Sequence, residues 1–129
     1  MATPISQAYK ELSKHQTIKD LFKGKFYREE IPKEILQNKN TIVNSMPFAR
    51  INDITNERIG YASNRANYTQ STLQLSVWGD KYSTLDQIDE ALNEFMAAMG
   101  YAETFSYTTR DPDIDKPYLV KRYSYYKEL

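Results

Sequence analysis

The chain of 129 residues contains no cysteine and a single histidine, His15. Without cysteine it has no disulfide framework, no thiolate zinc site and no cysteine nucleophile. One imidazole excludes every metal or catalytic site that needs two or more histidines. The four glycines, at positions 24, 60, 79 and 100, are far apart, so the sequence has neither a GxGxxG motif nor a P-loop. These absences disfavour most classes of enzyme.

Long hydrophobic runs are also missing. No stretch approaches the roughly 20 apolar residues of a membrane span, and the N-terminal sequence MATPISQAYKEL lacks the apolar region of a signal peptide. We therefore expect no membrane partner. With 40% apolar residues and eleven tyrosines, the chain has enough apolar surface for one core, and its length predicts one domain over residues 1–129.

Charge is distributed unevenly, although Lys+Arg and Asp+Glu both total 17. Residues 1–28 have a balance of +4, residues 84–115 a balance of −7 and residues 116–129 a balance of +3. A nucleic-acid-binding domain usually has one dominant basic patch, which this pattern lacks. This separation of charge along the sequence has two interpretations. The charged segments can be ordinary solvent-exposed faces that lie among one another after folding, or they can form opposed patches that steer one copy of the chain onto another.

Two amphipathic helices are predicted. Thr3-Pro4 marks the start of the first, with threonine as N-cap and proline at the first helical position, and this helix ends near His15. A further helical turn covers residues 18–22. The second helix spans residues 84–99, with Ser83 or Thr84 as N-cap and Gly100 as the C′ residue. Its polar face has four acids and no base: Asp86, Asp89, Glu90 and Glu94.

Five segments are predicted to be strands. In each of them, apolar residues alternate with polar ones or turn-forming residues stand at the ends of the segment. They cover residues 25–31, 47–54, 72–78, 104–110 and 118–126. Between the first two, residues 32–46 are polar and irregular, with a helical turn at 33–37. The short links predict a single α+β domain: a mainly antiparallel sheet of about four to five strands, two helices packed on one face, and the order α-β-β-β-α-β-β.

A calcium loop is the one metal motif that the sequence imitates. Asp111, Asp113 and Asp115 occupy its first three ligand positions, but Lys116 stands where the loop needs glycine and Arg122 where it needs glutamate. The segment therefore indicates a hairpin turn, and no metal, cofactor or catalytic residue is predicted.

The last predicted strand is rich in tyrosine and basic residues, namely Tyr118, Tyr123, Tyr125, Tyr126, Lys121, Arg122 and Lys127. Interleaved aromatic and basic side chains can form a stacking platform for single-stranded nucleic acid. The same composition is typical of the apolar face of an edge strand, or of a protein interface. All three interpretations stay open at this point.

The order of these segments resembles that of the tail-terminator (tail-completion) proteins of long-tailed bacteriophages, the lambda tail-terminator family. The resemblance rests on the helix ISQAYKELSKHQTIKDLF, on the strand that Pro47 opens in MPFARIND, and on residues 71–101, STLQLSVWGDKYSTLDQIDEALNEFMAAMGY. It continues into the terminal hairpin and so covers nearly the whole chain. It implies a small subunit without enzymatic activity or cofactor that forms a ring, typically a hexamer, on the finished tail tube.

According to this resemblance, the ring stops polymerisation of the tube and provides the surface for head attachment. The implied partners are other copies of the chain, the major tail-tube protein and a head-completion or connector protein. The implied location is the head–tail junction of the virion, and the host cytoplasm during assembly. The resemblance also implies that DNA can pass through the ring, without specific nucleic-acid binding by the chain. Another head–tail connector or neck protein is the alternative within this class, and a nucleic-acid-binding module is the alternative outside it.

Two sets of contact residues are predicted. The polar segment 55–67, either a mobile loop or the extended tip of a hairpin, is expected to contact a partner through Asn56, Glu57, Arg58, Tyr61, Asn64 and Arg65. The acidic helix face is expected to meet a basic surface of the neighbouring copy, either residues 10–28 or Lys121 and Arg122. The predicted subunit interface therefore comprises Asp86, Asp89, Glu90, Glu94, Lys121 and Arg122.

Overall fold

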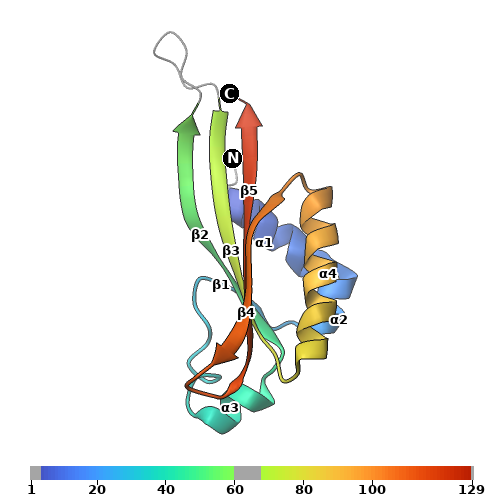
Figure 1. The fold of residues 1–129 in the computed structure, drawn as a ribbon, viewed down its shortest axis with the longest axis vertical. Coiled ribbons are helices and arrows are strands. Elements are labelled where there is room, and N and C mark those ends of the chain that lie inside the picture. The colour runs from blue at the N-terminus through green and yellow to red at the C-terminus, as the bar shows by residue number, and fades with distance from the viewer. Residues whose placement is uncertain (1–3, 60–67, 129) are drawn as a thin grey trace.

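The computed structural model describes residues 4–59 and 68–128. Its centre is a five-stranded sheet in the order β1-β2-β3-β5-β4 (Figure 1). The strands are β1 (Phe26–Arg28), β2 (Phe48–Ile59), β3 (Tyr68–Trp78), β4 (Ala102–Asp111) and β5 (Lys116–Glu128). Among these described strands, β1 and β2 pair in parallel and the other pairs are antiparallel. The predicted α+β class with a mainly antiparallel sheet is confirmed.

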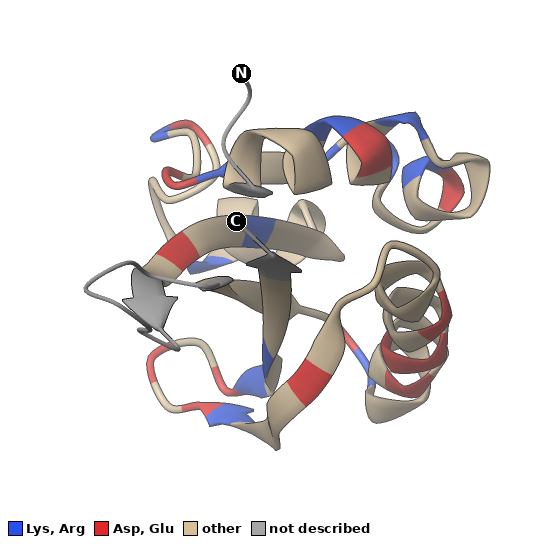
Figure 2. Ribbon diagram, turned by 90° about the horizontal axis from the view of Figure 1, so that it is seen from above, with Lys and Arg blue, Asp and Glu red and all other residues tan. Residues whose placement is uncertain are grey.

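Three helices cover one face of this sheet: α1 (Pro4–Lys14), α2 (Gln16–Phe22) and α4 (Tyr82–Ala98) (Figures 1 and 2). The main core lies between them and the sheet, because the apolar stripe of each helix meets the apolar side chains that alternate along the strands. Its largest fully buried members are Tyr123, Phe22, Ile5, Leu12, Ile18, Ile51, Leu73, Leu75, Leu85 and Ile88.

The opposite, helix-free face of the sheet is covered at one end only. Phe48 lies on this face and is buried, and it does not belong to the main core cluster; Ile35 and Ile114, outside the strands, are also buried apart from that cluster. Phe48 stacks on Trp78, and Trp78 stacks on Tyr118, with ring centroids 5.1 and 4.8 Å apart. These three rings lie on adjacent strands β2, β3 and β5 at one level of the sheet.

A short helix, α3 (Lys39–Asn44), lies in the segment 32–46 that was expected to be irregular. The feature of the sequence that marks this helix is a capping box at its start, not a regular spacing of apolar residues. The Thr41 backbone N–H donates to Asn38 Oδ1 at 3.0 Å, and the Asn38 N–H donates to Thr41 Oγ1 at 3.1 Å. Polar residues therefore begin this helix, and an apolar pattern could not predict it.

Of the two predictions for the ends of α4, one was wrong and one is confirmed. The N-cap prediction was wrong: Lys81 is the N-cap, without a side-chain cap bond, because the Leu85 N–H already bonds the Lys81 carbonyl. The C′ prediction is confirmed. Gly100 has φ 89°, its N–H bonds the Ala97 carbonyl, and the Tyr101 N–H bonds the Met96 carbonyl at 2.9 Å. This pair of bonds is the Schellman motif.

Replacing Gly100 by alanine is expected to destabilise the chain more than replacing Gly24 by alanine. Both glycines have positive φ, 89° and 81°, which costs an alanine about 1–2 kcal/mol. A Cβ at Gly100 would also lie 3.2 Å from Tyr125 Cε2, whereas nothing lies within 4 Å at Gly24. Urea unfolding of both variants measures the difference; equal losses would show that the tyrosine ring yields without cost.

Candidate assembly surfaces

Strand β4 forms an open edge of the sheet. It is the last strand in the order, and among residues 4–59 and 68–128 it pairs with β5 alone. All residues from 102 to 108 are exposed, so neither face of β4 is covered along this stretch. Proteins usually protect a long edge strand with lysine, proline or a bulge. Beyond a bulge at Thr104, residues 105–111 (FSYTTRD) contain no lysine or proline.

A second open edge lies at the other end of the sheet. Strand β1 has three residues and pairs only with Ala49–Ile51 of β2. Within the described part of the chain, no strand pairs with the outer edge of β2 from Asn52 to Ile59. Within the described residues, the sheet therefore has a strand edge on each side that no further strand covers.

The predicted partner-contact segment divides into two parts. Asn56, Glu57 and Arg58 belong to β2, opposite Ser71, Gln70 and Thr69 of β3. Residues 55–59 continue β2 and pair with β3, which agrees with the hairpin interpretation for this part of the segment. The other three predicted residues, Tyr61, Asn64 and Arg65, lie outside the described residues.

The acidic face of α4 is turned away from the sheet (Figure 2). Asp86, Glu90 and Glu94 are exposed, as a surface for another copy requires. Asp89 differs, since it binds a lysine of its own chain. Three of the four predicted acids are thus available at the surface.

Lys121 is completely buried, which corrects the prediction that it lies at a subunit surface. Its side chain is 0% exposed; its Nζ contacts Asp89 Oδ1, lies 3.2 Å from Glu103 Oε1 and donates to Asn93 Oδ1 at 2.6 Å. The physical reason is strand parity. Lys121 pairs with Leu75 and shares the helix-covered face with Leu119 and Tyr123, so its charge is neutralised within its own chain.

Arg122 points to the helix-free face instead. It is exposed, its Nε donates to Gln74 Oε1 at 3.1 Å, and its guanidinium lies 5.4 Å from the centre of the Phe105 ring. This residue remains available for an interface. Phe105 and Tyr107 on β4 add exposed aromatic surface to the same face, with 45% and 53% exposure.

The tyrosines of β5 do not form a continuous exposed row. Tyr123 is buried, Tyr118 stacks on Trp78, and Tyr125 packs against Tyr101 with ring centroids 5.2 Å apart. Tyr126 is 55% exposed. Most of these rings therefore contribute to packing, which weakens the interpretation as a nucleic-acid stacking platform.

Burial also changes how two tyrosines titrate. It raises the pKa of Tyr101 to about 12, with smaller contributions from Tyr125 and Asp53. It also raises the pKa of Tyr123, with contributions from Glu103 and Asp89. The unfolded chain ionises these phenols near pH 10, so the unfolded state binds fewer protons than the folded state above that pH. Stability must then fall as the pH rises.

We expect the urea midpoint to decrease between about pH 10 and pH 12. The Tyr101→Phe variant should show a smaller decrease, because its unfolded state gains nothing from ionisation at this position. Tyr126→Phe, at an exposed position, is the matched control and should follow the unmodified chain. Identical pH profiles for Tyr101→Phe and the unmodified chain would contradict this assignment.

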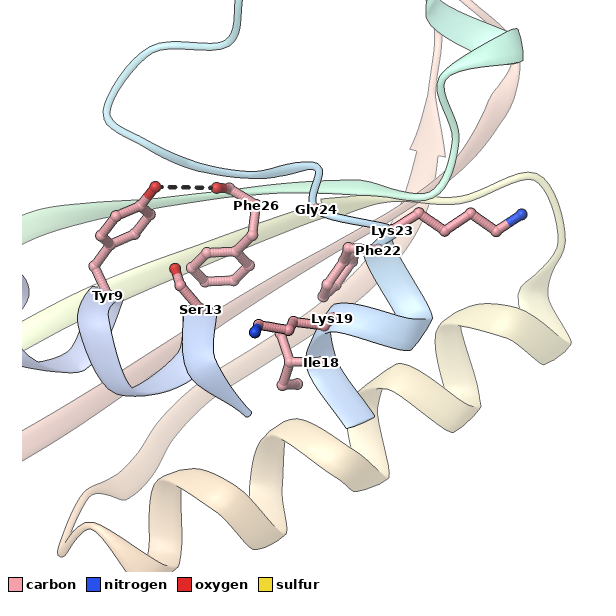
Figure 3. Close-up of a pocket in the computed structure, with 8 residues that line it drawn as sticks. All are labelled: Tyr9, Ser13, Ile18, Lys19, Phe22, Lys23, Gly24 and Phe26. Carbon is pink, nitrogen blue, oxygen red and sulfur yellow. Dashed lines mark hydrogen bonds between the residues drawn. The ribbon is translucent and has the colours of Figure 1, made fainter. Parts of the chain in front are cut away.

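A pocket of about 370 Å³ lies between α1, α2 and β1 (Figure 3). Ile18, Phe22 and Phe26 give it a buried apolar floor. Tyr9 bridges one side, where its hydroxyl donates to the Phe26 carbonyl oxygen at 3.4 Å. Its remaining lining residues are Ser13, Lys19, Lys23 and Gly24. This composition suits an apolar side chain.

In the described ranges, 4–59 and 68–128, no three His, Cys, Asp or Glu residues are grouped so that they could hold a metal ion. No helix in these ranges is long and apolar enough to cross a membrane. No protein-family model matches the chain, and no curated protein is significantly similar to it.

Proposed function

We propose that the chain is a structural subunit of a bacteriophage tail that forms a ring on the end of the tail tube. The ring ends tube polymerisation and provides the surface for head attachment. The observation that carries this proposal is the pair of open strand edges on opposite sides of one sheet. Two different surfaces that bind each other make a head-to-tail contact, and such contacts generate closed rings or filaments.

Two further features support the proposal. The main helices and strands, α1, β1, β2, β3, α4, β4 and β5, follow the order expected from the sequence, and the resemblance to tail-terminator proteins rests on that order. The exposed acids of α4 are also separated from the basic residues of α1 and α2, as expected for subunits that present unlike patches to one another. The partners of the proposed ring are the major tail-tube protein and a head-completion protein, at the head–tail junction of the virion.

Electron microscopy of particles made without this chain tests the function. We expect tails of excessive or irregular length that are not joined to heads, and restoration of uniform tails when the chain is supplied. Tails of normal length that remain unjoined would instead indicate the alternative, a head-completion or neck protein. Tails of normal length joined to capsids would contradict both functions.

The nucleic-acid-binding alternative has a separate test. The aromatic and basic residues of the helix-free face, Phe105, Tyr107 and Arg122, are the observation that favours it. Titration with labelled single-stranded DNA at two salt concentrations tests this alternative, because binding through phosphate contacts weakens steeply as the salt concentration rises. Our proposal expects no specific binding.

A further inference from the structure

We propose that β4 of one copy adds to the free edge of β2 in the next copy, so that the sheets of neighbouring subunits join into one continuous sheet. This inference rests on the proposed function only in taking the assembly as a ring. The occupant of the β4 edge is a second copy of this chain, because the chain itself offers the complementary free edge at the other end of its sheet.

The topology fixes the direction of this pairing. Strands β2 and β5 run in the same direction, since each is antiparallel to β3, and β4 runs against β5. The arrowheads in Figure 1 show the same directions. In a ring whose copies all point the same way, β4 is therefore antiparallel to β2 of its neighbour. Antiparallel addition needs no crossover connection and continues the dominant pairing of the sheet.

The registers also show how far neighbouring copies must be displaced along the strands. Tyr107 pairs with Val120, Val120 with Ser76, and Ser76 with Arg50. The middle of β4 therefore lies level with Arg50, whereas the middle of the free β2 edge lies near Thr55. Because β2 has a bulge at Ile54, these two levels are Ser76 and Thr72 on β3, and matching them requires an offset of about four residues, or roughly 14 Å at about 3.4 Å per residue.

A ring of tilted strands supplies an offset of this size. The step from β2 of one copy to β2 of the next spans four strands, or about 19 Å at about 4.8 Å per strand. Strands in closed sheets tilt by about 35–45°. The tangent of that tilt multiplied by the step gives about 13–19 Å along the strands. The offset that the registers require lies inside this interval.

The same offset avoids the short strand β1. It places Tyr107 opposite Thr55 of the neighbour, so that residues 103–110 of β4 run along residues 52–59 of β2. Strand β1 pairs with residues 49–51 and ends where β4 would begin. The free stretch of β2 thus has the length that the unprotected part of β4 needs.

Cysteine cross-linking tests this arrangement, because the chain has no cysteine of its own. In the predicted register Thr108 lies opposite Ile54 of the neighbour, and both positions are exposed. The double variant Thr108→Cys/Ile54→Cys should oxidise to a ladder of linked chains longer than dimers. Ser106→Cys with Ile54→Cys covers a register shifted by two residues.

Three outcomes would overturn the inference. The first is a ladder just as strong from Thr108→Cys with Tyr82→Cys, a control pair with Tyr82 46% exposed on α4. The second is a strong dimer from Thr108→Cys alone, which would indicate two-fold pairing of β4 with β4. The third is the absence of linked chains longer than dimers from both test pairs, whether the chain forms rings or stays monomeric at high concentration.

An edge-blocking variant provides an independent readout. Thr108→Lys adds a charge to the edge and should weaken self-association by about tenfold or more, while Tyr82→Lys should not. Unchanged thermal unfolding of both variants shows that the fold is intact. Unchanged association of Thr108→Lys contradicts the inference. The tail-length experiment decides the proposed function separately, since rings can form through another surface.

Discussion

Replacing Lys121 by alanine is expected to destabilise the chain by about 3 kcal/mol. Removing one partner of a buried ion pair costs about 3–5 kcal/mol because the remaining charge loses its compensation. The lower end applies here, since the side chains of Asp89 and Glu103 are 37% and 36% exposed and water still reaches them. The variant also takes a hydrogen bond from Asn93. Urea unfolding measures the loss.

Lys116→Ala is the matched control for this prediction. Lys116 Nζ lies 2.9 Å from Asp80 Oδ1, but the two side chains are 29% and 51% exposed. A surface ion pair of this kind contributes about 0–1 kcal/mol, so the control should lose less than about 1 kcal/mol. Lys121→Met keeps most of the side-chain volume and separates lost packing from lost charge. Comparable losses for Lys121→Ala and Lys116→Ala would contradict the structural role of the buried lysine.

Elements with a strong hydrophobic period were predictable from the sequence. The alternation of Leu73, Leu75 and Val77 located β3, and a broad apolar face located α4. The end of β2 was not predictable, because residues 55–59 are mostly polar and only pairing with β3 makes them a strand. Helix α3 depends on the capping box of Asn38 and Thr41, which is a local polar signal.

The candidate assembly surfaces were less predictable, for two physical reasons. The partners of Lys121 are Asp89 and Glu103, which lie far away in the sequence. The only local sign that this lysine is buried is that the residues two positions before and after it are apolar. The open edge of β4 depends on strand order, because β5 inserts between β3 and β4. Hairpin-length links do not determine that order. Sequence reasoning therefore selected charged surfaces and missed the backbone edges.

Replacing Phe48 by alanine is expected to destabilise the chain by about 3–5 kcal/mol, the usual loss when a large aromatic ring is removed from a core. Phe48 is 1% exposed although it lies on the helix-free face. Its ring stacks on Trp78, which in turn donates its Nε1–H to Asp111 Oδ2 at 3.3 Å and lies under the Arg50 guanidinium at 5.7 Å. The cavity would therefore loosen a row of contacts across three strands.

Phe105→Ala is the matched control on the same face of the sheet. Phe105 is 45% exposed at the β4 edge and contacts Arg122, so its loss should cost less than about 1 kcal/mol, as is usual for exposed positions. Thermal unfolding of the two variants side by side measures the contrast. A small loss for Phe48→Ala would mean that this end of the helix-free face is open and available to a partner. A large loss confines the accessible part of that face to the region around Phe105, Tyr107 and Arg122, beside the edge where the next copy is proposed to join.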